Sequence, residues 1–175
     1  MHDFNDIYCL GYVETMPNRI KKKDMIYHEF DIQVLKELSK PVKIHVLNKI
    51  ENNLKVISSI RVNDVVLIKG HVQKRHKDDV YIYIIDIIKL NTSSLEKEKA
   101  IIRLLSHPEI NNNVYIQGTA VDEKNLQVER QSKYKTTTLY DILETEGFQF
   151  EAGKQYAISG QLQNDVIMKK EKINC

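Results

Sequence analysis

The sequence predicts an all-β protein with short helices, made of two tandem five-stranded β domains joined by a helix. Three observations lead to this fold class. Apolar and polar residues alternate along most of the first half, a helical segment lies near the middle, and short motifs of the first half recur in the second half. The chain has 175 residues, which is enough for one ordinary domain or two small ones.

Five strands are predicted in the first domain. Every second residue is apolar in residues 7–13, 26–34 and 42–47, with His28 as the exception. This is the period of a strand with one buried face. Residues 65–73 and 80–90 are rich in Val, Ile and Tyr, the residue types that fit a pleated surface. These five segments predict five strands, with a break after the third.

The break after the third strand is predicted to be a short helix. Residues 49–60 place Ile50, Leu54 and Ile57 three or four positions apart, which is the spacing of one helical face. The first domain is therefore expected to run strand, strand, strand, helix, strand, strand.

A second helix is predicted between the two domains. Ser93 and Glu96 form a capping box at its start. Pro108 ends it, because the residue before a proline avoids the helical region. We expect this helix over residues 94–106. The first domain, the connector and the second, shorter domain then occupy residues 1–91, 92–110 and 111–175.

Short motifs recur in the same order after the connector, which indicates two copies of one small β domain. The second copy is shorter, because its two glycines are 42 positions apart and those of the first copy are 59 apart. Chance similarity between β sequences is the alternative explanation. The matched segments are Ile7–Gly11 with Val114–Gly118, Ile68–Gln73 with Ile158–Gln163, and Asp79–Ile82 with Asp165–Met168.

Several classes of protein are excluded by what the sequence lacks. No apolar run approaches the roughly 18 residues of a membrane span, and residues 1–11 show no signal peptide. Cys9 and Cys175 are too few for a disulfide framework or a zinc site, and we expect reduced thiols in a cytoplasmic protein. No phosphate-binding loop and no HExxH motif occurs, so we expect no enzyme, no cofactor and no metal.

Positive charge is concentrated in the first half of the chain. Residues 1–92 carry 15 Lys and Arg against 12 Asp and Glu, whereas residues 93–175 carry 11 against 12. Arg19–Lys23 and Lys74–Lys77 hold two basic clusters. A charge cluster is usually a solvated face, and it becomes a candidate for binding where the fold brings clusters to one side.

A five-stranded barrel with a helix between its third and fourth strands is the oligonucleotide/oligosaccharide-binding fold, the OB-fold. Three stretches carry a further resemblance: Leu10–Pro17, Asn48–Asn53 and Ile60–Arg75, of which the last is the most specific. Through them, residues 6–91 resemble the bacterial-type single-stranded DNA-binding proteins of this fold. Asn63–Asp64 supplies the turn of the last stretch, because Asn tolerates a positive φ. The second half resembles the family only through the internal repeat.

The resemblance implies binding of single-stranded DNA without strong sequence preference, in DNA replication, recombination or repair. It also implies a dimer or tetramer in the nucleoid, with other replication proteins as partners. Family members stack bases on aromatic residues, often Trp, but this chain has no Trp. Where the family commonly has an acidic tip, the chain has the mixed, basic Lys169–Cys175, so recruitment through such a tail is not implied.

The candidate binding residues combine positive charge with aromatic faces, as single-strand binders do. Both basic clusters fall on the loops that flank the ligand path of an OB-fold, where they would neutralise phosphates and make affinity salt-dependent. Tyrosines of outward parity would stack bases, although Tyr81 also fits a structural role in the barrel. Residues 127–138 are a further candidate in the second domain. The predicted nucleic-acid-binding residues are Tyr12, Arg19, Lys21, Lys22, Lys23, Tyr27, Lys43, His45, Lys74, Arg75, His76, Lys77 and Tyr81.

Two other functions fit the same architecture. An OB-fold scaffold subunit of a replication complex would contact only proteins, which agrees with the missing Trp and the modest net charge of +2. An OB-fold can also bind single-stranded RNA, since the difference rests on contacts to the 2′-hydroxyl. Salt-dependent binding to DNA, and competition between matched DNA and RNA, discriminate among the three functions.

Overall fold

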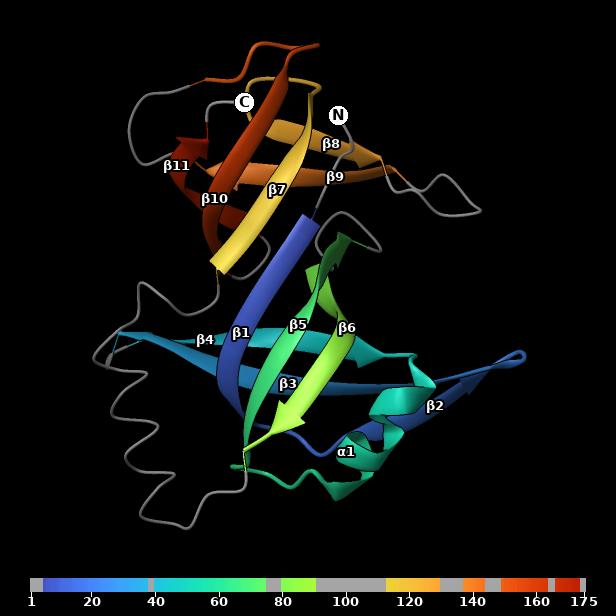
Figure 1. The fold of residues 1–175 in the computed structure, drawn as a ribbon. Helices are drawn as coiled ribbons and strands as arrows, with labels where there is room; N and C mark the ends of the chain where they lie inside the picture. Colours follow the sequence, from blue (N-terminus) through green and yellow to red (C-terminus); the bar gives the residue numbers. More distant parts are fainter. Residues whose placement is uncertain are drawn as a thin grey trace. The chain divides into compact units, whose positions relative to one another are not determined.

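The computed structural model describes residues 5–37, 40–74, 80–90, 113–129, 137–143, 149–163 and 166–173. This part of the chain is mostly β-strand with one short α-helix, which confirms the all-β prediction (Figure 1). Of the described residues, 7–71 and 81–90 form one compact unit, and the rest form a second. We call them the N-terminal unit and the C-terminal unit.

The strands follow one another along the chain with few interruptions. The N-terminal unit is built on β1 (Asn5–Val13), β2 (Asn18–Lys22), β3 (Met25–Glu37), β4 (Lys40–Asn48), β5 (Val65–Lys74) and β6 (Val80–Lys89). The ends of three of these strands, residues 5–6 of β1, 72–74 of β5 and 80 of β6, group with the other unit. The C-terminal unit is built on β7 (Asn113–Ala120), β8 (Asn125–Glu129), β9 (Thr137–Leu143), β10 (Gln155–Gln163) and β11 (Val166–Ile173). The predicted helix over residues 94–106 lies outside the described residues.

Five strands of the N-terminal unit close into a barrel. β1 pairs antiparallel with both β3 and β5, β3 pairs antiparallel with β4, and β4 pairs parallel with β6. β6 lies next to β5, so the pairing returns to its start. This closed barrel fits the OB-fold.

The barrel interior follows the predicted alternation. Ile7, Cys9 and Val13 are buried on β1, and the residues between them are more exposed. Ile26 was predicted to face inward, but 44% of it is exposed. The prediction is wrong there because β3 has left the barrel at this position and pairs with β2. Further buried side chains of the barrel are Phe30, Ile32, Val34, Ile44, Val46, Val66, Ile68, Ile82 and Ile84.

Two glycines let strands approach closely where the barrel curves. A Cβ atom at Gly11 would lie 2.6 Å from the carbonyl oxygen of Gln33 on β3. A Cβ at Gly70 would collide with the carbonyl oxygen of Tyr83 on β6. Because Cβ atoms essentially never come this close to backbone, glycine is required at both positions.

The helix between the third and fourth barrel strands is present, as a 3₁₀ turn η1 (Glu51–Asn53) that continues into α1 (Leu54–Ser59). Two asparagines fix it to the barrel. The buried Asn53 donates from Nδ2 to Asn48 Oδ1 at 2.9 Å and to the carbonyl of Ile85 at 3.3 Å. Ile57 is the buried residue of α1.

The turn between α1 and β5 adopts the predicted conformation. Asn63 has a positive φ of 68°. Its N–H donates to the carbonyl of Val13 at 2.8 Å, and the N–H of Val13 donates to the carbonyl of Asp64 at 2.9 Å. Lys89 Nζ lies 2.7 Å from the buried Asp64 carboxylate. The turn therefore ties the ends of three strands together.

A two-stranded arm formed by β2 and the start of β3 extends beyond the barrel (Figure 1). Its turn is Lys23–Asp24, and Lys23 has a φ of 54°. The basic segment 19–23 was predicted as a loop. Most of it is strand instead, because it pairs residue by residue with β3.

The strands of the C-terminal unit pair in a cycle of their own. β7 pairs antiparallel with β8, and β8 with β9, while β9 pairs parallel with β11. β11 pairs antiparallel with β10, which pairs antiparallel with β7. No helix within the described ranges has the length and apolar character to cross a membrane.

Candidate nucleic-acid interface

The arm divides its basic residues between two faces. Residues directly opposite each other on paired strands point to the same side. Lys22 lies opposite Met25 and Ile20 lies opposite Tyr27, so these four share one face, which we call the tyrosine face. Arg19 lies opposite His28 and Lys21 lies opposite Ile26 on the other face, which we call the arginine face. The predicted cluster is therefore not one continuous patch.

The tyrosine face combines an aromatic ring with positive charge. Lys49 Nζ lies 5.8 Å from the centroid of the half-buried Tyr27 ring. Met25 is 53% exposed beside it, and Lys22 is exposed. A flat apolar surface edged by ammonium groups can stack a base and contact its phosphate. Lys49 was not predicted as a binding residue, because it follows the last residue of β4 and only the fold brings it close to Tyr27.

The arginine face contains a histidine with a shifted pKa. Burial lowers the pKa of His28, and the neighbouring positive charge of Arg19 lowers it further. Its Nδ1 atom is buried. His28 is therefore disposed to be neutral, which leaves Arg19 and Lys21 as the cations of this face.

The outer face of β3 and β4 carries a network of ion pairs. Lys43 Nζ lies 3.2 Å from Asp31 Oδ2 and 3.3 Å from Glu14 Oε2. His45 Nδ1 lies 2.9 Å from Asp31 Oδ1, and His45 Nε2 lies 3.6 Å from Glu29 Oε2. The hydrogen bonds of Lys43 to Asp31 and then to Glu14 raise its pKa. Lys43 and His45 were predicted as direct contacts to nucleic acid, but both already face carboxylates.

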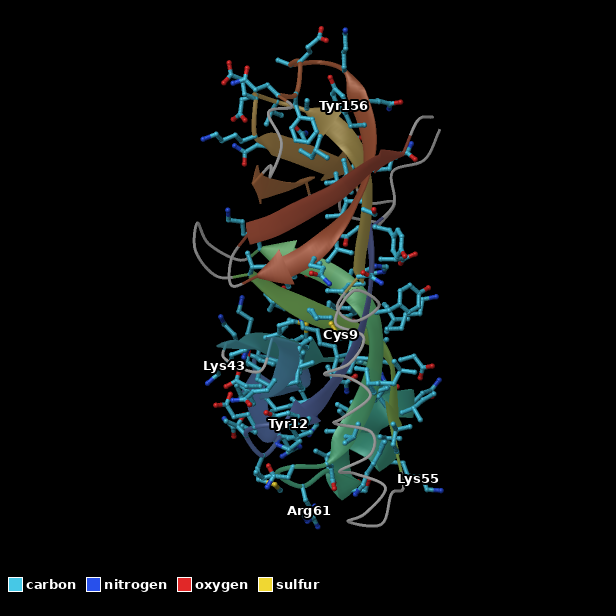
Figure 2. The ribbon with its side chains drawn as sticks, turned by 90° about the vertical axis from the view of Figure 1, so that its left-hand side faces the viewer. Cys9, Tyr12, Lys43, Lys55, Arg61 and Tyr156 are labelled. Carbon is cyan, nitrogen blue, oxygen red and sulfur yellow. The ribbon has the colours of Figure 1, made fainter. Side chains whose placement is uncertain are left out.

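Lys43 nevertheless stays accessible. Its side chain is 55% exposed, and Figure 2 shows it on the outside of the barrel. Tyr12 shares this outer face, because Tyr12 lies opposite Gln33 and Gln33 lies opposite Lys43. We call this surface, from Tyr12 across to His45, the strand face.

Tyr81 does not offer a ring face to a base. It is 7% exposed, so its predicted role in stacking is corrected to a structural one. Lys74 is the last residue of β5 and is half-buried. The other members of the second basic cluster, Arg75, His76 and Lys77, lie outside the described residues.

The charged partners of the strand face were missed by sequence reasoning. Glu29 and Asp31 occupy outward positions of a strand that the alternation predicted. This alternation could have placed both carboxylates on the outer face. Their pairing with Lys43 and His45 depends on the register of β3 against β4, where Asp31 lies opposite His45. Register is a property of the folded sheet.

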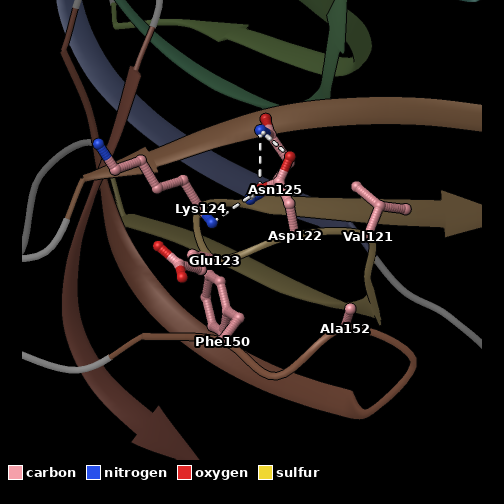
Figure 3. A pocket seen from close by; sticks show the side chains of 7 residues that line it. All are labelled: Val121, Asp122, Glu123, Lys124, Asn125, Phe150 and Ala152. Carbon is pink, nitrogen blue, oxygen red and sulfur yellow. Dashed lines mark hydrogen bonds between the residues drawn. The ribbon is translucent and has the colours of Figure 1, made fainter.

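The C-terminal unit has an open pocket of about 670 Å³ beside the β7–β8 turn (Figure 3). The N–H of Lys124 and then the side chain of Asn125 donate to Asp122 and lower its pKa. Phe150 lies at the pocket with its ring centroid 4.9 Å from that of Tyr156. The predicted segment 127–138 contributes the end of β8 and the start of β9, and residues 130–136 lie outside the described part. The lining residues are Val121, Asp122, Glu123, Lys124, Asn125, Phe150 and Ala152.

No group of three or more His, Cys, Asp or Glu side chains in the described part is placed to hold a metal ion. The chemistry available on the arm and the strand face is that of noncovalent contacts: aromatic stacking, phosphate neutralisation and hydrogen bonding to carboxylates.

Comparison with known proteins identifies the fold. No family model and no curated protein matches the sequence. The wild-type single-stranded DNA-binding protein from Thermus aquaticus matches with a TM-score of 0.69 at 10% identity, over 100% of this chain and 95% of that one. A deletion mutant of the same protein matches with a TM-score of 0.65 at 11% identity, over 99% and 96% of the two chains. The chain thus shares the fold of this single-stranded DNA-binding protein over nearly the whole of both sequences.

Proposed function

We propose that this protein binds single-stranded DNA without strong sequence preference, through the arm and the strand face of its N-terminal unit. The observation that carries the proposal is the tyrosine face, where Tyr27, Lys49 and Lys22 combine a ring with two ammonium groups. Such a surface serves a base and its phosphate together. The shared fold with a single-stranded DNA-binding protein supports the same function.

The role follows from this mode of binding. Protecting transient single strands during replication, recombination or repair needs stacking and charge, so the protein acts without catalysis, in the nucleoid, beside other replication proteins. Self-association into a dimer or tetramer is part of the proposal. An exposed patch on the outside of β1 and β5 supports it, since Tyr8 and Leu67 are 42% and 39% exposed and Lys69 Nζ lies 5.6 Å from the Tyr8 ring centroid.

We further propose that the C-terminal unit is a second, shorter OB domain, with a domain order of 1–91, 92–110 and 111–175. The order of its strand pairings matches that of the N-terminal barrel. Ile7 lies opposite Gly70 in one unit, and Val114 lies opposite Gly160 in the other. These four residues are the ones that the internal repeat aligns.

Backbone details support the same proposal. Val13 accepts from Asn63 N–H and donates to the Asp64 carbonyl, and the equivalent Ala120 accepts from Gly153 N–H and donates to the Lys154 carbonyl. Asn63 and Gly153 have φ values of 68° and 83°. A turn of this geometry at the same point of two barrels is expected from duplication of one domain.

The test is fluorescence anisotropy of a labelled oligo(dT) of about 35 nucleotides, long enough for two OB sites. We expect submicromolar binding at low salt that weakens as salt rises. Tyr27→Ala removes the stacking ring and is expected to weaken binding by roughly tenfold or more, because stacking contributes about 1–3 kcal/mol per base. Lys55→Ala, at an exposed position of α1, is the matched control and should bind as the wild type does.

Each alternative function has its own outcome in this test. Absence of binding at low salt, in a protein with an intact circular dichroism spectrum, would overturn the proposal and favour a protein scaffold. Stronger competition by a matched RNA oligonucleotide than by unlabelled DNA would favour an RNA-binding protein.

A further inference from the structure

β2 has a free edge along its whole length. It is the last strand in the order of its sheet, and in the described part of the chain it pairs with β3 alone. Four of its five residues are exposed and Ile20 is half-buried. A strand edge of this kind presents backbone N–H and C=O groups that another polypeptide strand can pair with.

The register of the arm decides which residues direct their backbone groups to this edge. Residues of an antiparallel pair alternate between hydrogen-bonded and non-hydrogen-bonded positions. The two-residue turn Lys23–Asp24 closes on Lys22 and Met25, which makes that pair a hydrogen-bonded one. Counted back along β2, Lys21 and Arg19 are then non-hydrogen-bonded positions. Their N–H and C=O groups point away from β3, to the free edge.

The side chains of the same two residues put positive charge along the edge. Arg19 and Lys21 lie on the arginine face and are exposed. Neither forms an ion pair with another described residue. Ile20, between them, lies on the tyrosine face. The order of side chains along the edge is therefore cation, apolar residue, cation.

An extended acidic polypeptide fits this edge better than a nucleic acid or a second copy of the chain. A polypeptide strand carries both donors and acceptors, so it satisfies the N–H and the C=O groups of Arg19 and Lys21. The phosphodiester backbone of a nucleic acid offers acceptors and no donor, so the two carbonyl groups would gain no partner. A second copy of β2 would place cations opposite cations, which is destabilising.

We propose that the free edge of β2 is a docking site for an extended acidic segment of a partner protein, which adds to the arm as an antiparallel strand. Its acidic side chains lie opposite Arg19 and Lys21, where opposite charges attract, and an apolar side chain between them lies beside Ile20. The proposed DNA binding is carried by the tyrosine face. The inference goes beyond that function and does not depend on it.

The test uses the full chain and an acetylated, amidated heptapeptide, Thr-Asp-Val-Glu-Val-Asp-Thr, in which acidic and apolar residues alternate. NMR follows the backbone amides of Arg19 and Lys21 at up to about 1 mM peptide. We expect their hydrogen exchange to slow about tenfold when about 90% of the chains are occupied, since only free chains exchange. Added salt should weaken binding, because the attraction is between exposed charges.

Two N-methylated forms of the peptide separate strand pairing from attraction between charges alone. In an antiparallel addition the amides of the acidic residues face Arg19 and Lys21, and the amides of the two valines point to solvent. Methylation of the acidic residues' amides removes donors of the new ladder and should weaken binding by roughly tenfold. Methylation of the valine amides is the matched control and should change it much less. Equal losses in the two forms would overturn strand addition.

A charge swap tests the chemistry of the partner. The double variant Arg19→Glu with Lys21→Glu should lose the acidic peptide and bind the peptide in which lysine replaces each acidic residue. Lys55→Glu, at an exposed position of α1, is the control and should keep the preference for the acidic peptide. Circular dichroism checks that each variant is folded.

The exchange measurement on the wild type decides the inference even where a variant fails to fold. Amides of Arg19 and Lys21 that are unaffected by the acidic peptide would overturn it. Protection of the same amides by oligo(dT) and not by the peptide would also overturn it, and would assign the edge to nucleic acid. Failure of the protein to bind DNA would overturn the proposed function and leave peptide docking unaffected.

Discussion

At the scale of single residues, Arg19 and His28 are the clearest case of one side chain changing the pKa of another. They lie opposite each other on the arm. Burial and the charge of Arg19 both lower the pKa of His28. The unfolded chain binds a proton there near pH 6.5, so His28 stabilises the native state fully above that pH. This contribution is lost as the pH falls through the lower native pKa.

The first prediction concerns this pair. Replacing Arg19 with Gln removes a neighbouring positive charge, so the pKa of His28 should rise toward its ordinary value. NMR titration of the His28 ring measures the change. Lys55→Gln, which removes a lysine from α1, should leave the titration where it is, and an unchanged midpoint in Arg19→Gln would show that burial alone sets the pKa.

The second prediction concerns Cys9. Its sulfur lies inside the barrel (Figure 2), and burial raises its pKa far above the ordinary value of a thiol. Because the thiolate is the reactive form, a Cys175→Ser variant should not react with a thiol reagent such as DTNB while native. Addition of urea should release one reactive thiol per chain as the barrel unfolds. Rapid reaction of the native variant would mean that Cys9 is accessible.

At the scale of elements, the first strand of each unit approaches its neighbour at a glycine. A Cβ at Gly118 would lie 2.5 Å from the carbonyl oxygen of Gln127, as one at Gly11 would lie 2.6 Å from that of Gln33. The valine after each of these glutamines provides the next contact, Val34 in one unit and Val128 in the other. The close approach of β1 to β3 and that of β7 to β8 therefore both require a residue without a Cβ atom.

The third prediction follows from this close approach. Gly11→Ala and Gly118→Ala should each lower the free energy of unfolding by about 1–3 kcal/mol, because the added methyl group overpacks a rigid backbone contact. Urea unfolding followed by circular dichroism measures the loss. Thr119→Ala is the control on the adjacent, half-buried position, and it should stay within about 0.5 kcal/mol of the wild type.

The barrel strands could be predicted from the sequence because they bury one face. Alternation identified β1, β3 and β4, and Asn63 identified the turn before β5. The separate strand β2 was missed, because Asn18–Lys22 contains a single apolar residue and owes its conformation to pairing with β3. Burial leaves a periodic signal in a sequence, and pairing of two exposed strands does not.

The candidate surface was predictable in part for a related reason. Tyr12, Tyr27 and Lys22 have the residue types that the proposed binding needs, and each lies on an exposed face of its strand. The candidate roles of Lys49 and of the carboxylates around Lys43 depend on residues of other strands, which only the fold brings next to them. Tyr81 has the outward parity of a stacking residue, but it is buried. The alternation of one strand does not reveal what covers its outer face.

At the scale of the whole molecule, the two units differ most in the arm. Gly11 and Gln33 are 22 positions apart, whereas Gly118 and Gln127 are 9 apart. This difference of 13 makes up most of the shortening of the second half. In place of the basic arm, the C-terminal unit has the short turn around Asp122 and Glu123. Contacts to phosphates should therefore come mainly from the N-terminal unit.

The fourth prediction tests this asymmetry through the salt dependence of DNA binding. Each phosphate contact to a single strand contributes about 0.7 to the slope of log affinity against log salt. Lys22→Gln should reduce the slope by about that amount. Lys124→Gln, in the turn of the C-terminal unit, should leave it unchanged. Equal reductions in the two variants would show that both units contact phosphates alike.

The exposed edge of β2 has a consequence for solubility. Within the described residues β2 pairs with β3 on one side, and its other side is the end of the sheet. An unpaired strand edge can template the addition of another chain. Arg19, Lys21 and Lys22 put like charges on both faces of this edge, so two copies repel each other there. A polyanion that neutralised those charges would remove the repulsion. The same lysines that we propose to contact DNA are therefore also expected to protect the free protein from edge-to-edge aggregation.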